Sequence, residues 1–348
     1  MCPAGSLQGR KLENGWIVDS QMPSSVAGTG GHFSTGYFVH NVNGQKAFLK
    51  AMDLHQALQK SGDTAMHLKH AVDAYIFERD LLIQCRDKRL KRIVLPLDSG
   101  EVNASGGPLG FNKVYYIIFE LASGDIRKQK ATWQNLDLVI TLRVLHHAAT
   151  GLKQLHANGI AHQDIKPSNL LVFQKQEVKI ADLGRASHYQ MTSFVDGAPM
   201  PGDSGYAPPE QWYQFKSYNN FNDRLIADLY LLGSLLFFYF SGLSAYGALV
   251  SKLQIQHANG LLNGEFENDL PYLQNAFASV LEDLKKEVTP IGGSGTNEIV
   301  EIARQLCNPD PRRRGDPAAK LAGRSTCDLH GYISRFDRLA KHAELKLL

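Results

Sequence analysis

The side chains best suited to chemistry lie in the stretch HQDIKPSNLLVF, which covers residues 162–173. Asp164, Lys166 and Asn169 follow one another there at short spacing, just ahead of a hydrophobic run. Asp164 can accept or orient the proton of a hydroxyl group, and Lys166 can neutralise a phosphate. Asn169 can offer its amide oxygen to Mg²⁺. A short polar loop between a helix and a strand would present all three side chains from one fixed backbone.

Three more residues extend this set. Asp182, in ADLG after the strand-like VKI, supplies the hard carboxylate that a Mg²⁺–phosphate complex needs. Lys50 ends the apolar stretch AFLK, where a buried lysine needs an anionic partner, and Glu78 on the following helix can provide it. A single aspartate in a loop is more often a turn or cap residue. The ordered set therefore indicates the chemistry, rather than any one member.

The elements that would position Lys50 and Glu78 form a small antiparallel sheet with one main helix. Asn43-Gly44 is a strong hairpin signal, so we expect residues 37–42 and 45–50 to pair. A helical pattern covers residues 65–87. Further strands are predicted at 16–22, 92–98 and 113–122.

The second half of the chain is predicted to be mainly helical. A long helical pattern covers residues 136–158, with Gly159 as its C-terminal stop. Short strands are expected at 170–173 and 177–180, and they flank a turn. An irregular segment follows from about 185 to 210, and helices dominate from there onward. Ligands favour the crevice between two such lobes, here a β-rich first half and a helical second half of the chain.

The composition is that of a protein with a large core. The 348 residues are 43% hydrophobic and 20% charged, and the net charge of +3 gives no indication of a nucleic-acid partner. The four cysteines are scattered without a Cys-x-x-Cys pair, which is typical of reduced thiols in a cytoplasmic protein. The first residues lack the apolar core of a signal peptide.

Residues 225–250 form the one run long and apolar enough to span a bilayer, with Asp228 as its single charge. The run contains three glycines and has no basic flank beyond Arg224. We therefore expect a helix buried at the centre of a large domain, and no membrane partner.

Taken together, these motifs resemble those of the protein kinase family, of the serine/threonine type, over residues 16–315. HQDIKPSN stands in place of the catalytic loop, DLG at 182–184 in place of Asp-Phe-Gly, and AFLK holds the ATP-binding lysine. YAPPE at 206–210 resembles the Ala-Pro-Glu motif, and Arg314 is the expected partner of its Glu210.

The resemblance implies an α+β, bilobal fold with a small antiparallel β lobe and a larger helical lobe. The kinase domain would cover 16–315, divided into an N-lobe at 16–121, a hinge at 122–125 and a C-lobe at 126–315. Residues 316–348 carry apolar side chains at helical spacing, so we expect a helical extension that packs on the C-lobe.

The implied reaction is transfer of the γ-phosphate of ATP to serine or threonine hydroxyls of protein substrates. The implied catalytic residues are Asp164, Lys166, Lys50 and Glu78, and the implied ligands of Mg²⁺, or of Mn²⁺ in its place, are Asn169 and Asp182. ATP would further contact Phe119 as gatekeeper, the backbone of Glu120 and Ala122, Asp125 near the ribose, and the glycines Gly28, Gly30 and Gly31.

Four positions depart from the family pattern. The glycine-rich stretch places Phe33, or in a shifted register Ser34, where a third glycine belongs. Phe48 occupies a small-residue position over the adenine. Gln163 replaces the arginine that clamps a phosphorylated activation loop in many kinases, so we expect a kinase that is not switched through that contact. Asp203 stands where a threonine is usual; either it forms a salt link with Lys166 or Ser204 takes the role.

Two other functions fit part of the pattern. A small-molecule kinase of the aminoglycoside or choline type shares the His-x-Asp and downstream Asp elements, but the peptide-binding elements YAPPE and Arg314 argue against it. A pseudokinase scaffold is favoured only by the irregular glycines, Phe48 and Gln163. A catalytically inactive fold would have no need for the complete set of Lys50, Glu78, Asp164, Asn169 and Asp182.

Overall fold

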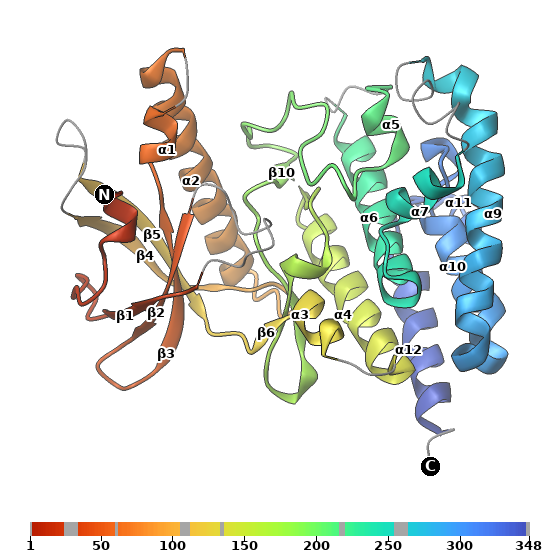
Figure 1. Ribbon diagram of the computed structural model, residues 1–348, viewed down its shortest axis with the longest axis horizontal. Helices are drawn as coiled ribbons and strands as arrows, with labels where there is room; N and C mark the ends of the chain where they lie inside the picture. Colours follow the sequence, from red (N-terminus) through yellow and green to blue (C-terminus); the bar gives the residue numbers. More distant parts are fainter. Residues whose placement is uncertain are drawn as a thin grey trace. The chain divides into compact units, whose positions relative to one another are not determined.

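The computed structural model describes residues 2–23, 34–59, 62–104, 112–132, 136–215, 220–253 and 264–345 (Figure 1). The chain divides into an N-terminal unit, Met1–Ser123, and a C-terminal unit, Gly124–Leu348. The first unit contains the strands β1 (Ile17–Gln21), β2 (Ser34–His40), β3 (Lys46–Met52), β4 (Pro96–Asn103) and β5 (Lys113–Glu120), and the helices α1 (His55–Leu58) and α2 (Thr64–Asp87).

The five strands pair antiparallel in the order β1-β2-β3-β5-β4. The predicted hairpin is confirmed: β2 and β3 pair, and the side chain of Asn41 accepts bonds from the backbone of Asn43 and Gln45. The prediction for β4 was wrong in its bounds. We expected residues 92–98, whereas the strand begins at Pro96 and continues to Asn103, because its partner β5 extends the ladder to Lys113.

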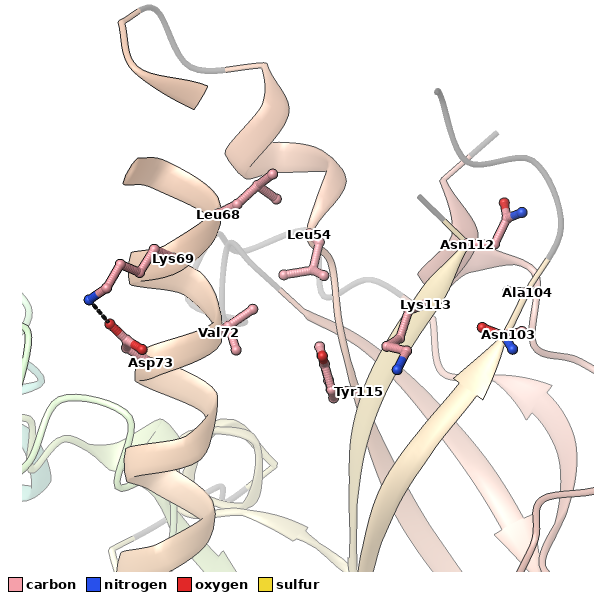
Figure 2. A pocket seen from close by; sticks show the side chains of 10 residues that line it. All are labelled: Leu54, Leu68, Lys69, Val72, Asp73, Asn103, Ala104, Asn112, Lys113 and Tyr115. Atoms are coloured by element: carbon pink, nitrogen blue, oxygen red, sulfur yellow. Dashed lines mark hydrogen bonds and ion pairs between the residues drawn. The ribbon is translucent and has the colours of Figure 1, made fainter. Parts of the chain in front are cut away.

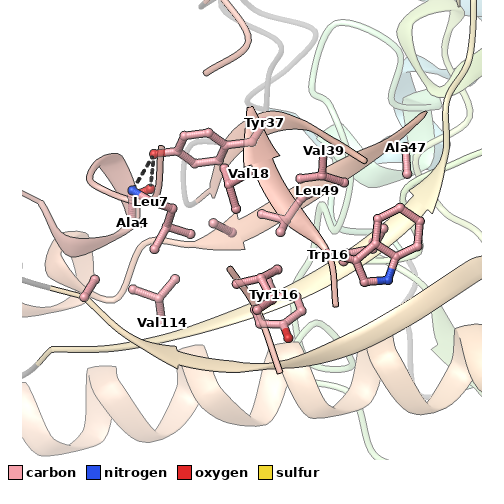
Figure 3. Close-up of a cluster of buried hydrophobic side chains, with 14 residues drawn as sticks. Ala4, Leu7, Trp16, Val18, Tyr37, Val39, Ala47, Leu49, Val114 and Tyr116 are labelled. Carbon is pink, nitrogen blue, oxygen red and sulfur yellow. Dashed lines mark hydrogen bonds between the residues drawn. The ribbon is translucent and has the colours of Figure 1, made fainter. Parts of the chain in front are cut away.

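One face of the sheet carries a buried apolar cluster that includes Trp16, Val18, Leu49 and Tyr116 (Figure 3). Tyr37 is part of it, and its hydroxyl donates to the carbonyl of Ala4 while it accepts from the amide of Leu7. These bonds satisfy the one polar atom of a buried ring. They also fix the N-terminal 3₁₀ turn Pro3–Gly5 on the sheet.

Helix α2 begins at an N-cap, because the side chain of Asp63 accepts from the amides of Ala65 and Met66. Tyr75 of α2 ties the helix to the sheet through a bond from its hydroxyl to the carbonyl of Tyr116. The helix therefore holds a fixed rotation against β5, which determines where Glu78 points.

A pocket of about 860 Å³ lies between α2 and the ends of β4 and β5 (Figure 2). Its walls include Leu54, Leu68, Val72 and Tyr115. Its two lysines are paired with carboxylates, Lys69 with Asp73 and Lys113 with Glu101. None of the predicted site residues that the structure describes lines this pocket.

The C-terminal unit is mainly helical. Its helices are α3 (Ile126–Ala131), α4 (Leu138–His156), α5 (Pro209–Trp212), α6 (Phe221–Ser241), α7 (Ala245–Lys252), α9 (Phe266–Gly292), α10 (Thr296–Leu306), α11 (Pro317–Leu321) and α12 (His330–Leu345). Short strands form two small sheets: β6 (Gly124–Asp125), β8 (Leu170–Val172) and β9 (Val178–Ile180) make one, and β7 (Ile160–Ala161) and β10 (Ser187–His188) make the other. With the sheet of the first unit, this is an α+β fold.

Helix α6 is the core of this unit. It is long and apolar enough to cross a membrane by length and composition, but 83% of its most apolar stretch is buried by the surrounding chain. The expectation of one helix over 225–250 was wrong. Gly242 adopts a left-handed φ of 77° that ends α6, and Ser244 then caps the separate helix α7.

Helix α12 packs along α4. Arg143 of α4 donates to Asp337 and to Glu344 of α12, so an ion-pair cluster supports the apolar contact. The C-terminal helix is thereby attached to the same helix that precedes the HQDIKPSN loop.

Candidate active site

The loop that carries Asp164 is anchored to the buried carboxylate of Asp228 on α6. One oxygen of Asp228 accepts from the amide of Gln163 at 2.7 Å, and the other accepts from the amide of His162 at 2.8 Å and faces His156 Nε2 at the same distance. The side chain is completely buried. Sequence reasoning missed this role, although a lone charge in an apolar run must be paired once it is buried.

Asp164, Lys166 and Asn169 form one contact cluster, as the sequence predicts. Lys166 Nζ lies 3.1 Å from Asp164 Oδ2. Asn169 Nδ2 donates to the same carboxylate at 3.0 Å and to the carbonyl of Asp164 at 2.8 Å. The 3₁₀ turn Pro167–Asn169 brings the asparagine back over the loop.

The charges in this cluster are mutually dependent. Burial raises the pKa of Asp164, and Lys166 opposes part of that rise. Burial would lower the pKa of Lys166, but Asp164 and Asp203 outweigh it and raise the pKa above the ordinary value. Lys166 is therefore a stable cation held between two carboxylates.

Asp203 brings the irregular segment at 183–209, called the activation segment from here on, onto the HQDIKPSN loop. Its carboxylate lies 3.2 Å from Lys166 Nζ, and its amide donates to Asp164 Oδ1 at 2.9 Å. Of the two roles left open, the salt link of Asp203 is the one observed. Asp164 is consequently held by three donors, which come from Lys166, Asn169 and the backbone of Asp203.

Asp182 follows β9 with a left-handed φ of 65°. The residue before it is bonded to the HQDIKPSN loop, because Ala181 donates its amide to the carbonyl of Asn169 and its carbonyl faces His162 Nε2. The charge of Asp182 also raises the pKa of Asp164. A left-handed φ at a non-glycine residue is a type of local strain found at functional sites.

The chemistry of Asn169 and Asp182 fits a Mg²⁺ ion. The amide nitrogen of Asn169 is used by Asp164, which leaves the oxygen of the same amide as the atom that can face a cation. Asp182 adds a carboxylate on a segment hydrogen-bonded to Asn169. Hard oxygen donors of this kind are those that Mg²⁺ takes, usually with water and substrate phosphates. Within the described ranges, His, Cys, Asp and Glu side chains form no cluster of three suited to a metal.

In the N-terminal unit, Lys50 and Glu78 form the predicted ion pair. Lys50 Nζ donates to the two carboxylate oxygens of Glu78 at 2.8 and 3.0 Å. The pair joins β3 to α2, and Glu78 is buried. A partly buried lysine is thereby oriented with its charge matched.

The residues predicted to contact the nucleotide base also have defined places. Phe119 lies on β5 opposite Phe48 of β3, and the two rings stack with centroids 6.5 Å apart. A Cβ on Gly36 would lie 2.7 Å from the Phe48 ring, so any larger residue there would require the ring to shift. Glu120 ends β5, and Ala122 follows it in the same unit.

Asp125 belongs to the C-terminal unit, where its side chain caps α3 by accepting from the amide of Lys128. The glycines Gly28, Gly30 and Gly31, together with Phe33, lie outside the described residues. The structure thus groups Lys50, Glu78, Phe119, Glu120 and Ala122 in one unit, and Asp125, Asp164, Lys166, Asn169 and Asp182 in the other.

The predicted ion pair between Glu210 and Arg314 is present and buried. Two guanidinium nitrogens of Arg314 donate to the two carboxylate oxygens at 2.6 and 2.9 Å. Arg314 also donates to the carbonyls of Asn308 and Ile226. This bidentate pair fastens the end of the activation segment to α6 and to the NPDPRRRG turn.

Comparison with known proteins agrees with these features. Residues 28–322 match the family described as "Protein kinase domain". The chain is 32% identical to mouse Aurora kinase C over 125 residues, which are 36% of this chain and 42% of the relative. It is 24% identical to the serine/threonine-protein kinase PknG of Mycobacterium leprae over 319 residues, which are 90% of this chain and 33% of the relative.

A third relative is the mitogen-activated protein kinase 13 of mouse, 25% identical over 217 residues, which are 60% of this chain and 55% of the relative. The matched regions thus span from a third to just over half of these relatives' lengths. The domain match covers most of the chain and includes Lys50, Asp164 and Asp182. The chain belongs to the protein kinase family.

Proposed function

We propose that this protein is an active serine/threonine kinase that transfers the γ-phosphoryl group of ATP to hydroxyls of protein substrates. The observation that carries the proposal is the buried cluster of Asp164, Lys166 and Asn169, with Asp182 on the segment bonded to it. The name of the relative PknG, a serine/threonine-protein kinase, supports the choice of acceptor.

Asp164 would orient the acceptor hydroxyl and receive its proton. The carboxylate has three donors fixed around it, so it is held in one orientation. Phosphoryl transfer passes through a loose transition state, in which positioning and charge neutralisation contribute most of the rate enhancement. Lys166, kept cationic by two carboxylates, would offset the negative charge of the transferring group.

Lys50 and Glu78 would act on the nucleotide. Glu78 holds the ammonium of Lys50 in place, and Lys50 would bind the α- and β-phosphates. The backbone of Glu120 and Ala122 would meet the adenine next to Phe119, with Asp125 near the ribose and Gly28, Gly30 and Gly31 over the phosphates. This assignment takes residues 122–125 as the hinge of a kinase domain that covers 16–315, with 316–348 as its C-terminal extension.

Asn169 and Asp182 would hold the metal, through the amide oxygen of the first and the carboxylate of the second. When bound, Mg²⁺, or Mn²⁺ in its place, supplies neutralisation of charge on the phosphate oxygens. Asn169 has a second role that needs no metal, because its amide nitrogen keeps the Asp164 carboxylate in orientation.

The experiment is to incubate the purified protein with γ-labelled ATP and Mg²⁺ in parallel reactions. One set contains generic protein substrates rich in serine or threonine, one contains tyrosine polymers, and one contains aminoglycosides, choline and sugars. We expect label on serine or threonine of protein. Label on a small molecule would instead support the aminoglycoside or choline type, and label nowhere would support a scaffold role.

A further inference from the structure

The activation segment places a carboxylate of its own against a buried arginine. Asp196 lies in the irregular segment after β10, and its Oδ1 is 2.5 Å from Nη1 of Arg224 on α6. A second nitrogen of Arg224 donates to the backbone carbonyl of Asp196 at 3.3 Å. The other carboxylate oxygen accepts from the amide of Ser193 at 2.7 Å. Asp196 is thus fixed by both its backbone and its side chain.

The same carboxylate continues into the catalytic loop through a buried hydroxyl. Ser187 Oγ donates to Asp196 Oδ1 at 2.9 Å, and it accepts from Nε2 of Gln163 at 2.6 Å. The chemistry of the carboxylate, the hydroxyl and the amide determines which group donates in each bond. A carboxylate only accepts, so Ser187 gives it the one hydroxyl proton and keeps its lone pairs for the amide of Gln163.

Gln163 needs such support because its backbone is strained. Its φ of 63° is in the left-handed region, which a glutamine adopts at a cost in conformational free energy. The backbone amide is held by Asp228, and the side-chain amide also donates to the carbonyl of Arg185 at 3.2 Å. Gln163 immediately precedes Asp164, so its conformation sets the direction of the catalytic carboxylate.

Helix α6 provides the residues that hold both the loop of Gln163 and the Asp196 carboxylate. Asp228 holds the backbone of the catalytic loop, and Arg224, one turn earlier on the same helix, holds Asp196. Both side chains are buried. The segment between Leu183 and Pro209 has one arginine of its own, Arg185, whose guanidinium lies over the ring of Phe194 at 5.6 Å. The cation that receives the Asp196 carboxylate therefore comes from the helix rather than from the segment.

We propose that Asp196 is a positioning residue for phosphoryl transfer, which acts through Ser187 and Gln163 to hold Asp164 in its working orientation. The inference rests on the proposed kinase activity. The glutamine next to the catalytic aspartate thereby has a defined role, because it links that aspartate to a carboxylate built into the activation segment. No covalent modification of the segment is needed to supply the negative charge.

The test uses Asp196→Asn and Ser187→Ala, alone and combined, in the full-length protein. Both substitutions keep the shape of the site closely, and Ser187→Ala leaves the Asp196–Arg224 ion pair in place. Asp337→Asn, which weakens the ion-pair cluster between α4 and α12, is the control for a general loss of stability. For each variant we measure kcat, the KM for ATP, and backbone hydrogen exchange of residues 160–164 and 187–196.

The expected result is a fall in kcat of about tenfold or more in both single variants, with the KM for ATP within about twofold of wild type. The double variant should be no worse than Asp196→Asn, because residues in one chain of contacts are not additive. Exchange should be faster around Gln163 in both variants, and Asp337→Asn should leave kcat unchanged. Unchanged kcat in Ser187→Ala, or additive losses in the double variant, would overturn the inference.

The exchange measurement separates this inference from the proposed function. If the wild-type protein transfers no phosphate to any substrate, the proposed function fails. In that case, faster exchange at residues 160–164 in Asp196→Asn and Ser187→Ala still supports the link from Asp196 to the catalytic loop. Exchange equal to wild type in both variants would overturn it.

Discussion

At the scale of single residues, each unit contains buried carboxylates with a defined set of donors. Asp164 is oriented by Lys166, Asn169 and a backbone amide. Asp228 of α6 accepts from two backbone amides of the loop that carries Asp164. In the other unit, Glu78 matches the charge of Lys50. Removing one member of such a set leaves an uncompensated group, so single substitutions should have large and specific effects.

Substitution of Lys50 should impair the use of ATP more than any other step. Lys50→Met removes the cation proposed to meet the α- and β-phosphates, and kcat/KM for ATP should fall by about 10²-fold or more. Glu78→Gln should act in the same direction with a smaller loss, because Lys50 keeps its charge but not its orientation. Steady-state kinetics at varied ATP concentration checks this. Lys113→Met, in an exposed pair with Glu101, is the matched control and should match wild type.

Removal of divalent metal should abolish activity. Treatment with EDTA should stop transfer, and added Mg²⁺ or Mn²⁺ should restore it. Asn169→Ala should raise the Mg²⁺ concentration that gives half of the maximal rate, since the amide oxygen is lost from the proposed ligand set. Titration of the initial rate with Mg²⁺ is the measurement. Full activity in metal-free buffer would refute the proposed roles of Asn169 and Asp182.

At the scale of elements, ion pairs fasten loops and helices to the two long helices α4 and α6. The pair of Glu210 with Arg314 is buried, whereas the cluster of Arg143 with Asp337 and Glu344 is partly exposed. The buried pair should contribute far more to stability once one partner is removed, because water cannot compensate the charge that remains.

Arg314→Ala should therefore lower the free energy of unfolding by about 3–5 kcal/mol. Arg312→Ala removes an arginine two residues away whose side chain is about half exposed, and it should cost about 1 kcal/mol or less. Urea unfolding of both variants measures the difference. Equal losses from the two substitutions would contradict the assignment of Arg314 as the anchor of the activation segment.

The attachment of α12 should depend weakly on charge and on pH. Arg143→Met should lower the free energy of unfolding by about 1 kcal/mol, as expected of partly exposed pairs.

Lys341 and Arg143 hold the pKa of Asp337 below its ordinary value of 3.8. This contribution is therefore present at neutral pH and is lost as the pH falls through the lowered pKa. The stability difference between wild type and Asp337→Asn, followed by urea unfolding, should shrink in that acid range and remain constant between about pH 6 and 8.

At the scale of the whole molecule, the activation segment is held without any phosphate. Asp203 contacts Lys166, Asp196 contacts Arg224, and Glu210 contacts Arg314. Each of these carboxylates is part of the chain itself. These three carboxylates therefore have their charges matched as soon as the C-terminal unit folds.

Dephosphorylated protein should consequently be fully competent. The purified protein is treated with phosphatase, loss of phosphate is verified by mass spectrometry, and the initial rate on a protein substrate is measured. The rate should stay within about twofold of the untreated enzyme. A drop of about tenfold, equivalent to about 1.4 kcal/mol in the barrier, would show that a phosphate on a residue such as Thr192 is required.

Much of this arrangement can be predicted from the sequence, because local signals determine it. Asn43-Gly44 predicts the β2–β3 hairpin, and the need of a buried lysine for an anion predicts the pair of Lys50 with Glu78. The resemblance to protein kinases implies the pair of Glu210 with Arg314. The role of Asp228 and the contact of Asp196 with Arg224 could not be predicted in the same way. They depend on how α6 packs against two irregular loops, and neither loop has a periodic pattern that reveals its path.

The most direct test of the central claim is the rate of phosphate transfer from γ-labelled ATP to a serine- or threonine-containing protein by wild type and by Asp164→Asn, alongside ATP affinity measured by calorimetry. The substitution keeps the size of the side chain but removes the carboxylate that orients the hydroxyl. We predict a loss in rate of about 10²–10⁴-fold, with ATP affinity unchanged within about threefold. Equal rates for the two proteins, or no transfer by the wild type, would contradict the proposed kinase activity.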